Sequence, residues 1–127
     1  LALASMSAPA VAQQFANSGY AFLQAVRERD GAKVTELLNA PGSTVVNFRD
    51  DSGDTALHIT TARRDPQWMN FMLAKGADPN SGNRAGDTPL ILASRIGFVE
   101  GVDLLLRRRA QVDRTNRLGE TALIVAV

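Results

Sequence analysis

Apolar residues recur along this chain at the three- and four-residue spacing of short amphipathic helices. Two such segments fill residues 15–40, and the charged, glycine-containing stretch Arg29-Asp30-Gly31 separates them. Their apolar positions are Tyr20, Phe22, Leu23, Val26, Val34, Leu37 and Leu38. The pattern predicts a first pair of helices in this part of the chain.

A short box of residues recurs further along with a constant period of 33 residues. It reads Gly53-Asp54-Thr55-Ala56-Leu57, then Gly86-Asp87-Thr88-Pro89-Leu90, then Gly119-Glu120-Thr121-Ala122-Leu123. Two flanking columns keep the same register: Asn47, Asn80 and Asp113 in one, and Asp50, Asn83 and Asn116 in the other. A fixed period of this length is typical of a stacked repeat protein, in which each unit buries its apolar faces against its neighbours. We therefore divide the chain into one domain of repeats at approximately 15–49, 50–82, 83–115 and a partial 116–127.

The box has the chemistry of a helix start. The hydroxyl of Thr55 or Thr88 can accept a backbone N–H, and Pro89 follows at the first helical position, where proline costs nothing. The glycines that precede the threonines close a turn, which predicts a positive φ at Gly53, Gly86 and Gly119.

A second helix in each repeat follows the same logic. Asp65 and Pro66 predict its start in the second repeat, and Gly76 predicts a left-handed cap at its end. In the third repeat Arg109 takes the place of that glycine. A non-glycine residue in the left-handed region costs about 1 kcal/mol, and the sequence shows no compensation.

These motifs resemble the ankyrin repeat over roughly residues 20–127. The best copy spans residues 86–112, where Thr88-Pro89-Leu90 corresponds to the family's Thr-Pro-Leu-His box and Leu104-Leu105-Leu106 to its leucine run. Gly76-Ala77-Asp78-Pro79-Asn80 corresponds to the loop that the family writes Gly-Ala-Asp-Val-Asn. The resemblance implies an all-α solenoid of stacked helix-turn-helix units joined by short hairpin-like turns. The first repeat lacks the box, and its outgoing loop runs two residues longer than its counterparts.

The resemblance also implies a non-catalytic protein-interaction module, which binds its partner at the turn tips and on the concave face of the first helices. The positions that the family leaves variable there are Asp51, Ser52, Asp54, Arg63, Arg84, Ala85, Asp87, Arg95, Ile96, Arg117, Leu118 and Glu120. The arginines among them suit a protein partner with an acidic or mixed-charge patch. The alternative is an accessory or small anionic ligand-binding protein of the bacterial envelope, which would need an enclosed concavity of roughly 300 Å³ or more.

Composition narrows the possible chemistry. The 127 residues include no cysteine and one histidine, so the sequence excludes disulfides, thiolate nucleophiles, zinc–thiolate sites and multi-histidine metal sites. We find no nucleophile with a base, no useful carboxylate pair and no phosphate-binding loop, and we predict neither enzymatic activity nor a cofactor. The formal net charge of +1 gives no global attraction to nucleic acid. No segment reaches the apolar length of a membrane span.

Three local features each leave two interpretations open. The resemblance implies that the imidazole of His58 bridges adjoining turns. A catalytic role is the alternative, and it fits less well because the other repeats have isoleucine at this position. Trp68 is interpreted as part of the core, with ligand stacking as the alternative. A cluster of five arginines and one aspartate near the end of the third repeat has a local charge of 5 − 1 = +4. These arginines are either solvated at a helix C-terminus or contact an acidic partner. This cluster comprises Arg107, Arg108, Arg109, Arg114 and Arg117, with Asp113.

The two ends of the chain carry further expectations. Small and apolar residues lead into Ala10-Val11-Ala12, an Ala-x-Ala triplet typical of signal-peptide cleavage. We predict that residues 1–12 are the end of a signal peptide and that Gln13 begins an exported protein, periplasmic or secreted, of bacterial type. If residues 1–12 are only a disordered or helical leader, the expected location is the cytoplasm. The last residues fall inside the first helix of a fourth repeat, so we expect further repeats or another chain to cover that face.

Overall fold

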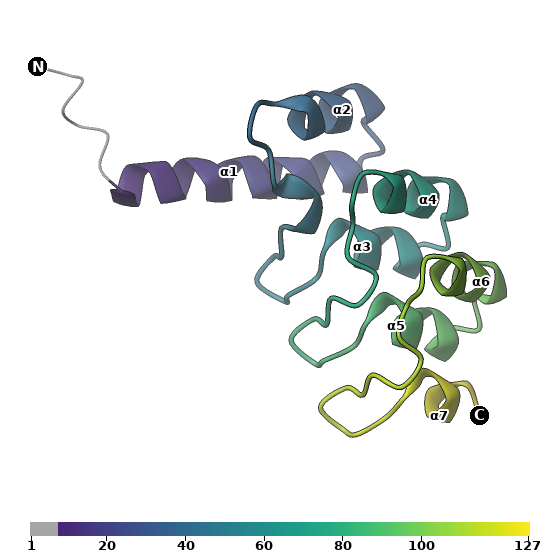
Figure 1. The fold of residues 1–127 in the computed structure, drawn as a ribbon. Helices are drawn as coiled ribbons and strands as arrows, with labels where there is room; N and C mark the ends of the chain where they lie inside the picture. Colours follow the sequence, from purple (N-terminus) through teal and green to yellow (C-terminus); the bar gives the residue numbers. More distant parts are fainter. Residues whose placement is uncertain (1–7) are drawn as a thin grey trace, which may run out of the picture.

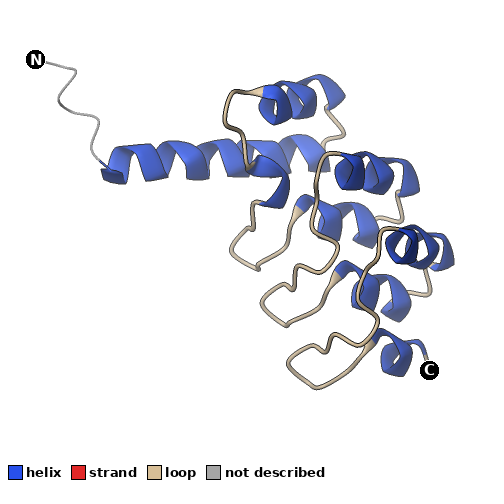
Figure 2. Cartoon of the chain, viewed as in Figure 1, coloured by secondary structure: helices blue, strands red, loops and turns tan. Residues whose placement is uncertain are grey.

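The structure is a computed structural model that describes residues 8–127. This range contains seven α-helices and one short 3₁₀ turn, and no strand (Figures 1 and 2). The helices are α1 (Ala8–Arg27), α2 (Gly31–Asn39), α3 (Ala56–Ala62), α4 (Pro66–Ala74), α5 (Pro89–Arg95), α6 (Val99–Arg107) and α7 (Ala122–Ala126), and the 3₁₀ turn η2 is Val45–Asn47.

The helices form two layers (Figure 1). An inner row consists of α1, α3, α5 and α7, an outer row of α2, α4 and α6, and the long turns project together to one side. Each inner helix packs against the outer helix that follows it, and consecutive inner helices pack against each other. The predicted all-α solenoid is confirmed.

The first helix starts earlier than the sequence pattern suggested. It was expected near residue 15, whereas α1 begins at Ala8 and runs without interruption through Ala12 to Arg27. The first seven residues of the expected signal peptide lie outside the described residues. A helix across the Ala-x-Ala triplet does not test whether the chain is cleaved there, so export stays a prediction.

The helix starts follow the predicted chemistry. The hydroxyl oxygens of Thr55, Thr88 and Thr121 accept the backbone N–H groups three residues ahead and so cap α3, α5 and α7. The carboxylate of Asp65 does the same for α4, with Pro66 as the first helical residue. Each cap satisfies a backbone donor that has no partner within the helix.

The repeated turns are joined to one another by main-chain and side-chain bonds. Within one turn, the Asn83 side-chain oxygen accepts the N–H groups of Ala85 and Asp87 at 3.1 and 3.0 Å. Its amide nitrogen donates to Asp54 of the preceding turn at 3.0 Å, and the N–H of Arg84 donates to the preceding turn's carbonyl oxygen. Asp50 and Asn116 make the same within-turn bonds in their own repeats. The repeating column of Asp and Asn therefore fixes both the turn and its spacing.

Two of the turn glycines also make room for the next turn. Gly53 and Gly86 have φ values of 77° and 80°, as predicted, and a Cβ at Gly86 would stand 2.9 Å from the backbone nitrogen of Arg117. Only glycine permits both the left-handed backbone and this close approach.

Burial confirms which helix faces form the core. Phe22, Leu23 and Val26 of α1 are fully buried, and α3 and α5 contribute Leu57 and Leu90. Tyr20, expected with the apolar set, is instead 45% exposed. Its ring packs edge-on against Phe48, and its hydroxyl donates to a carboxylate oxygen of Asp51 at 2.6 Å.

Polar contacts add to the apolar packing of α1 on α3 between the first and second repeats. Ion pairs join Arg27 to Asp50 at 3.0 Å and Arg29 to Asp65 at 3.5 Å. The guanidinium of Arg63 donates to the carbonyl oxygen of Val26. On the outer side, α4 packs against α6 but α2 makes little contact with α4.

Three arginines have left-handed backbone conformations. Arg109 was predicted to do so, and its φ is 62°. Arg29 and Arg64, both with φ of 56°, were not predicted. Each is the second residue after the end of its helix, α1 or α3, which is the position that Gly97 has after α5. Their side chains reach the following repeat, where Arg29 pairs with Asp65 and Arg64 donates to the carbonyl oxygen of Ile96.

Candidate functional site

The predicted binding face combines the turn tips with the exposed side of the inner helices. Between the second and third repeats it contains a hollow of about 540 Å³, open to solvent, lined by Arg27, Asp54, His58, Ile59, Ala62, Arg63, Asn83 and Leu92. Between the third and fourth repeats a similar hollow of about 560 Å³ is lined by Ala85, Asp87, Arg95, Asn116, Arg117, Leu118 and Glu120. Most of the predicted site residues line one of these two hollows.

The predicted site residues differ in accessibility. The exposed ones are Asp51, Ser52, Arg84, Ala85, Arg95, Arg117 and Leu118; the half-buried ones are Asp54, Arg63, Ile96 and Glu120; Asp87 is buried. Ile59 and Leu92 also line the first hollow and were not predicted. Their common position in the 33-residue register, one residue after the box histidine or isoleucine, is the signal that would have identified them.

Arg95 is held within the stack by two acidic side chains, Asp87 of its own repeat and Glu120 of the following one. Its guanidinium makes a two-point contact with the Asp87 carboxylate at 2.6 and 3.2 Å, and it also lies 3.4 Å from Glu120. Burial by itself would raise the pKa of Asp87, but hydrogen bonds from Arg95 and Asn116 outweigh it and hold that pKa below its ordinary value. The hydrogen bond to Asp87 likewise raises the pKa of Arg95. The charges of Arg95 and Asp87 are therefore both paired within the protein itself.

Arg63 is engaged in the same way. Its Nε atom lies 3.1 Å from the Asp65 carboxylate, one Nη donates to Val26, and the guanidinium lies 5.2 Å from the centroid of the Trp68 ring. The other Nη is buried without a hydrogen-bond partner among the described residues. Removing Arg63 would therefore disturb the packing between the first two repeats as well as any partner contact.

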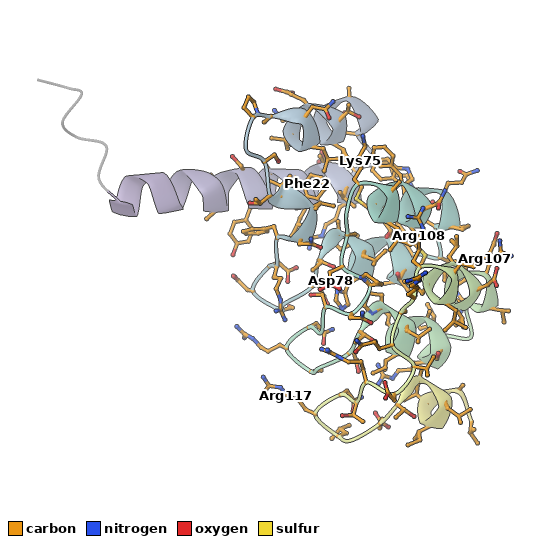
Figure 3. All side chains as sticks on the ribbon, viewed as in Figure 1. Phe22, Lys75, Asp78, Arg107, Arg108 and Arg117 are labelled. Atoms are coloured by element: carbon orange, nitrogen blue, oxygen red, sulfur yellow. The ribbon has the colours of Figure 1, made fainter. Side chains whose placement is uncertain are left out.

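Arg84 and Arg117 are different. Both are exposed at the tips of consecutive turns, and neither side chain has a hydrogen bond or ion pair within residues 8–127. Their backbone N–H groups, by contrast, are bonded to the preceding turn at 2.9 Å in each case. Leu118, next to Arg117, is 83% exposed. Figure 3 shows Arg117 at the tip of its turn, on the opposite side of the molecule from the outer helices.

His58 bridges two turns, as its position in the box predicted. The Nδ1 atom accepts the backbone N–H of Thr55 at 3.1 Å, which leaves the proton of a neutral ring on Nε2, and Nε2 donates to the carbonyl oxygen of Asp87 at 2.8 Å. Burial lowers the pKa of His58 below its ordinary value. Both ring nitrogens are thus committed to structural bonds.

The structure divides the arginine cluster, because Arg107 to Arg109 lie at the end of the outer helix α6 and Arg117 lies at a turn tip. Arg107 pairs with Asp103 at 3.0 Å one turn earlier, and Arg108 approaches the side-chain oxygen of Asn70 at 3.4 Å. Figure 3 shows both arginines with the outer helices, away from the turn tips. The cluster therefore does not extend the predicted binding face as a single surface.

The fold and this face define a stacked helical repeat protein with open hollows along its inner side. The family model described as "Ankyrin repeats (3 copies)" matches residues 64–127, half of the chain, so the chain belongs to the ankyrin repeat family. Ankyrin repeats generally serve as protein–protein interaction modules and are typically non-catalytic.

Curated relatives share short segments with this chain. Oxysterol-binding protein-related protein 1 from Homo sapiens is 41% identical over 71 residues, which are 56% of this chain and 8% of that protein. Its counterpart from Rattus norvegicus is 39% identical over the same length. The Transient receptor potential cation channel subfamily A member 1 homolog from Caenorhabditis elegans is 38% identical over 73 residues, 57% of this chain and 6% of that protein. The chain thus matches less than a tenth of each relative's length.

No helix within residues 8–127 is long and apolar enough to cross a membrane.

Proposed function

We propose that this chain is a non-catalytic module that binds a protein through the tips of its third and fourth turns and the concave face beside them. The observation that carries the proposal is the pair Arg84 and Arg117. Their backbones are fixed one repeat apart, while their guanidinium groups remain exposed and unpaired within the described residues. Two arginines held at a constant separation suit a partner with carboxylates at a matching separation.

The internal contacts of Arg63 and Arg95 make these two residues unsuitable for a test of this proposal. Substituting either one would weaken the stack, because both bind acidic groups of the protein itself. Charge reversal at Arg84 and Arg117 removes only exposed guanidinium groups. A double variant with the same change at Arg107 and Arg108 is the matched control, because those exposed arginines belong to the outer row.

The experiment is an affinity pull-down from an extract of the source organism with three proteins: the parent, R84E/R117E and R107E/R108E. We expect one partner to be captured by the parent and by R107E/R108E and to be lost with R84E/R117E. Capture that survives R84E/R117E but not R107E/R108E would move the site to the outer row. A parent that captures no protein would refute the proposal.

The alternative, binding of a small anionic molecule in the bacterial envelope, has less support. The two hollows on this face are large enough, at about 540 and 560 Å³, but they are open to solvent. Small-molecule sites usually enclose most of the ligand's surface. An open, charged face suits the broad surface of a protein better.

Export remains part of the proposal and rests on the Ala10-Val11-Ala12 triplet alone. Cleavage after Ala12 would remove the start of α1, which begins at Ala8. N-terminal sequencing of the protein purified from its natural source tests this step. Gln13 as the first residue would support export, and an intact start upstream of Ala10 would refute it.

A further inference from the structure

The outer row of helices has an unfilled interval between α2 and α4. There, α4 packs against α6 but makes little contact with α2. The interval contains a hollow of about 420 Å³, lined by Gly31, Thr35, Gln67, Trp68 and Phe71. We call it the outer groove. The two helices that line it, α2 and α4, belong to the outer row, on the opposite side of the stack from the turn tips (Figure 1).

The wall of the outer groove on the α4 side is aromatic. Trp68 and Phe71 are half-buried and pack against the core, and their rings meet edge-to-face with centroids 6.2 Å apart. The guanidinium of Arg63, itself paired with Asp65, lies 5.2 Å from the centroid of the Trp68 ring. Because both rings are held by their neighbours, a ligand that contacts them would not have to order them first.

The next interval along the outer row shows that this surface is particular to one place. Between α4 and α6 the hollow is lined instead by Pro66, Gln67, Asn70, Glu100, Asp103, Leu104, Arg107 and Arg108. Both charge signs occur there, and no aromatic side chain does. The repeat architecture alone therefore does not produce an aromatic groove; it follows from Trp68 and Phe71 on one side and Gly31 on the other.

The unpaired charge beside the aromatic wall of the outer groove is positive, whereas Asp30, just before α2, uses its carboxylate to cap that helix. The Lys75 ammonium lies 5.7 Å from the centroid of Phe71, and no carboxylate pairs with it among the described residues. On α2, Lys33 is paired with Glu36 at 3.5 Å, so that pair adds no net charge. Figure 3 shows Lys75 at the end of α4. An occupant that places a carboxylate at Lys75 would gain a partner for this ammonium.

We propose that the outer groove is a second docking site, which takes an acidic peptide segment with a large apolar side chain. The apolar side chain enters between Gly31 and the rings of Trp68 and Phe71, and a neighbouring carboxylate pairs with Lys75. The outer groove has a volume of about 420 Å³ and is open to solvent, as are the hollows beside the turn tips, which suits a peptide segment better than an enclosed small molecule. The site does not depend on the turn-tip arginines, so the two surfaces can be tested separately.

The chain provides its own reporter, because Trp68 is its single tryptophan. The probe is a short fluorescein-labelled synthetic peptide, free of tryptophan, in which leucine alternates with glutamate. A second peptide has lysine in place of glutamate. We expect a saturable change in Trp68 emission and in peptide anisotropy with the glutamate peptide, and binding at least about tenfold weaker with the lysine peptide.

Gly31→Leu is the decisive variant. Gly31 lines the outer groove, a Cβ there would meet nothing within 4 Å, and its φ lies outside the left-handed region, so a leucine side chain has room to enter the groove without disturbing the core. We expect binding of the glutamate peptide, followed by anisotropy, to weaken at least about tenfold in Gly31→Leu and also in Lys75→Glu. R107E/R108E is the matched control, because those arginines line the neighbouring interval between α4 and α6, and it should bind as the parent does. R84E/R117E is measured beside it to detect peptide bound at the turn tips.

Three results would overturn this proposal: no saturable binding of the glutamate peptide to the parent, equal binding of the lysine peptide, or unchanged binding in Gly31→Leu. Far-ultraviolet circular dichroism of each variant verifies that the helices are intact. Loss of peptide binding in R84E/R117E would also reject the outer groove, because it would assign the peptide to the turn tips.

Discussion

Replacing Arg109 by glycine should stabilise the protein. Arg109 ends α6 with a φ of 62°, and its side chain makes no hydrogen bond or ion pair within residues 8–127. A non-glycine residue in the left-handed region costs about 1–2 kcal/mol. Glycine returns about 0.5–1 kcal/mol of this through its greater freedom in the unfolded chain. The difference is between 0 and about 1.5 kcal/mol. From the middle of that range we expect Arg109→Gly to gain about 0.5–1 kcal/mol and to raise the melting temperature by about 2–4 °C.

Arg64→Gly is the matched comparison for Arg109→Gly. Its φ of 56° carries a similar backbone cost, but the side chain donates to the carbonyl oxygen of Ile96 and lies 6.0 Å from the centroid of Phe98. These contacts are worth about 0.5–1.5 and 0.5–1 kcal/mol respectively. Arg64→Gly should therefore give no gain, or a loss of up to about 2 kcal/mol.

Thermal and urea unfolding followed by circular dichroism measure both variants of this pair. The reasoning is refuted if Arg109→Gly is no more stable than the parent, because the backbone cost would then not be real. It is also refuted if Arg64→Gly gains as much as Arg109→Gly, because the contacts of Arg64 would then contribute nothing.

Two further predictions concern the bonds between turns. Burial lowers the pKa of His58 below its ordinary value of 6.5, so below about pH 6.5 the unfolded chain binds a proton at this residue that the folded chain does not. The contribution of His58 to the free energy of unfolding should therefore be complete above about pH 6.5 and decrease below it, by at most about 1.4 kcal/mol per pH unit. His58→Ile should remove this slope between about pH 7 and pH 5 in melting experiments, and an unchanged slope would assign it to other groups. Gly86→Ala should cost at least about 1 kcal/mol more than Gly42→Ala in urea titrations, since both have positive φ but only the Cβ at Gly86 meets the next turn; equal losses would contradict the steric argument.

Much of the fold could be predicted because residues 33 positions apart play the same structural role in successive repeats. A threonine at a helix start, a glycine in a tight turn and an asparagine after a loop each have one dominant local role. The roles of Thr55, Gly53 and His58 follow from that register and are confirmed. The left-handed conformation of Arg109 could be predicted for the same reason, since Gly76 occupies its position one repeat earlier.

The use of long side chains could not be predicted in the same way. Arg63, Arg84, Arg95 and Arg117 were equivalent candidates in the sequence, yet Arg63 and Arg95 bind acidic groups within the stack. An arginine side chain spans several ångströms, and its partner depends on which groups from neighbouring repeats lie within that reach. Trp68 shows the same limit: the sequence suggested a core residue, whereas the ring lies at the edge of the core beside a hollow. That hollow depends on the separation of α2 from α4, which no local motif encodes.

The contacts that hold the first repeat make its attachment sensitive to ionic strength. Arg27–Asp50 and Arg29–Asp65 are partly exposed ion pairs, and α2 contributes little packing against α4. Between the second and third repeats, the described residues form no ion pair, and α4 packs on α6. Salt screens charges over about 10 Å at 0.1 M and about 3 Å at 1 M. Raising its concentration should therefore weaken the attachment of the first repeat, so that the backbone amides of α1 and α2 exchange with solvent deuterium faster while those of α3 to α6 remain protected.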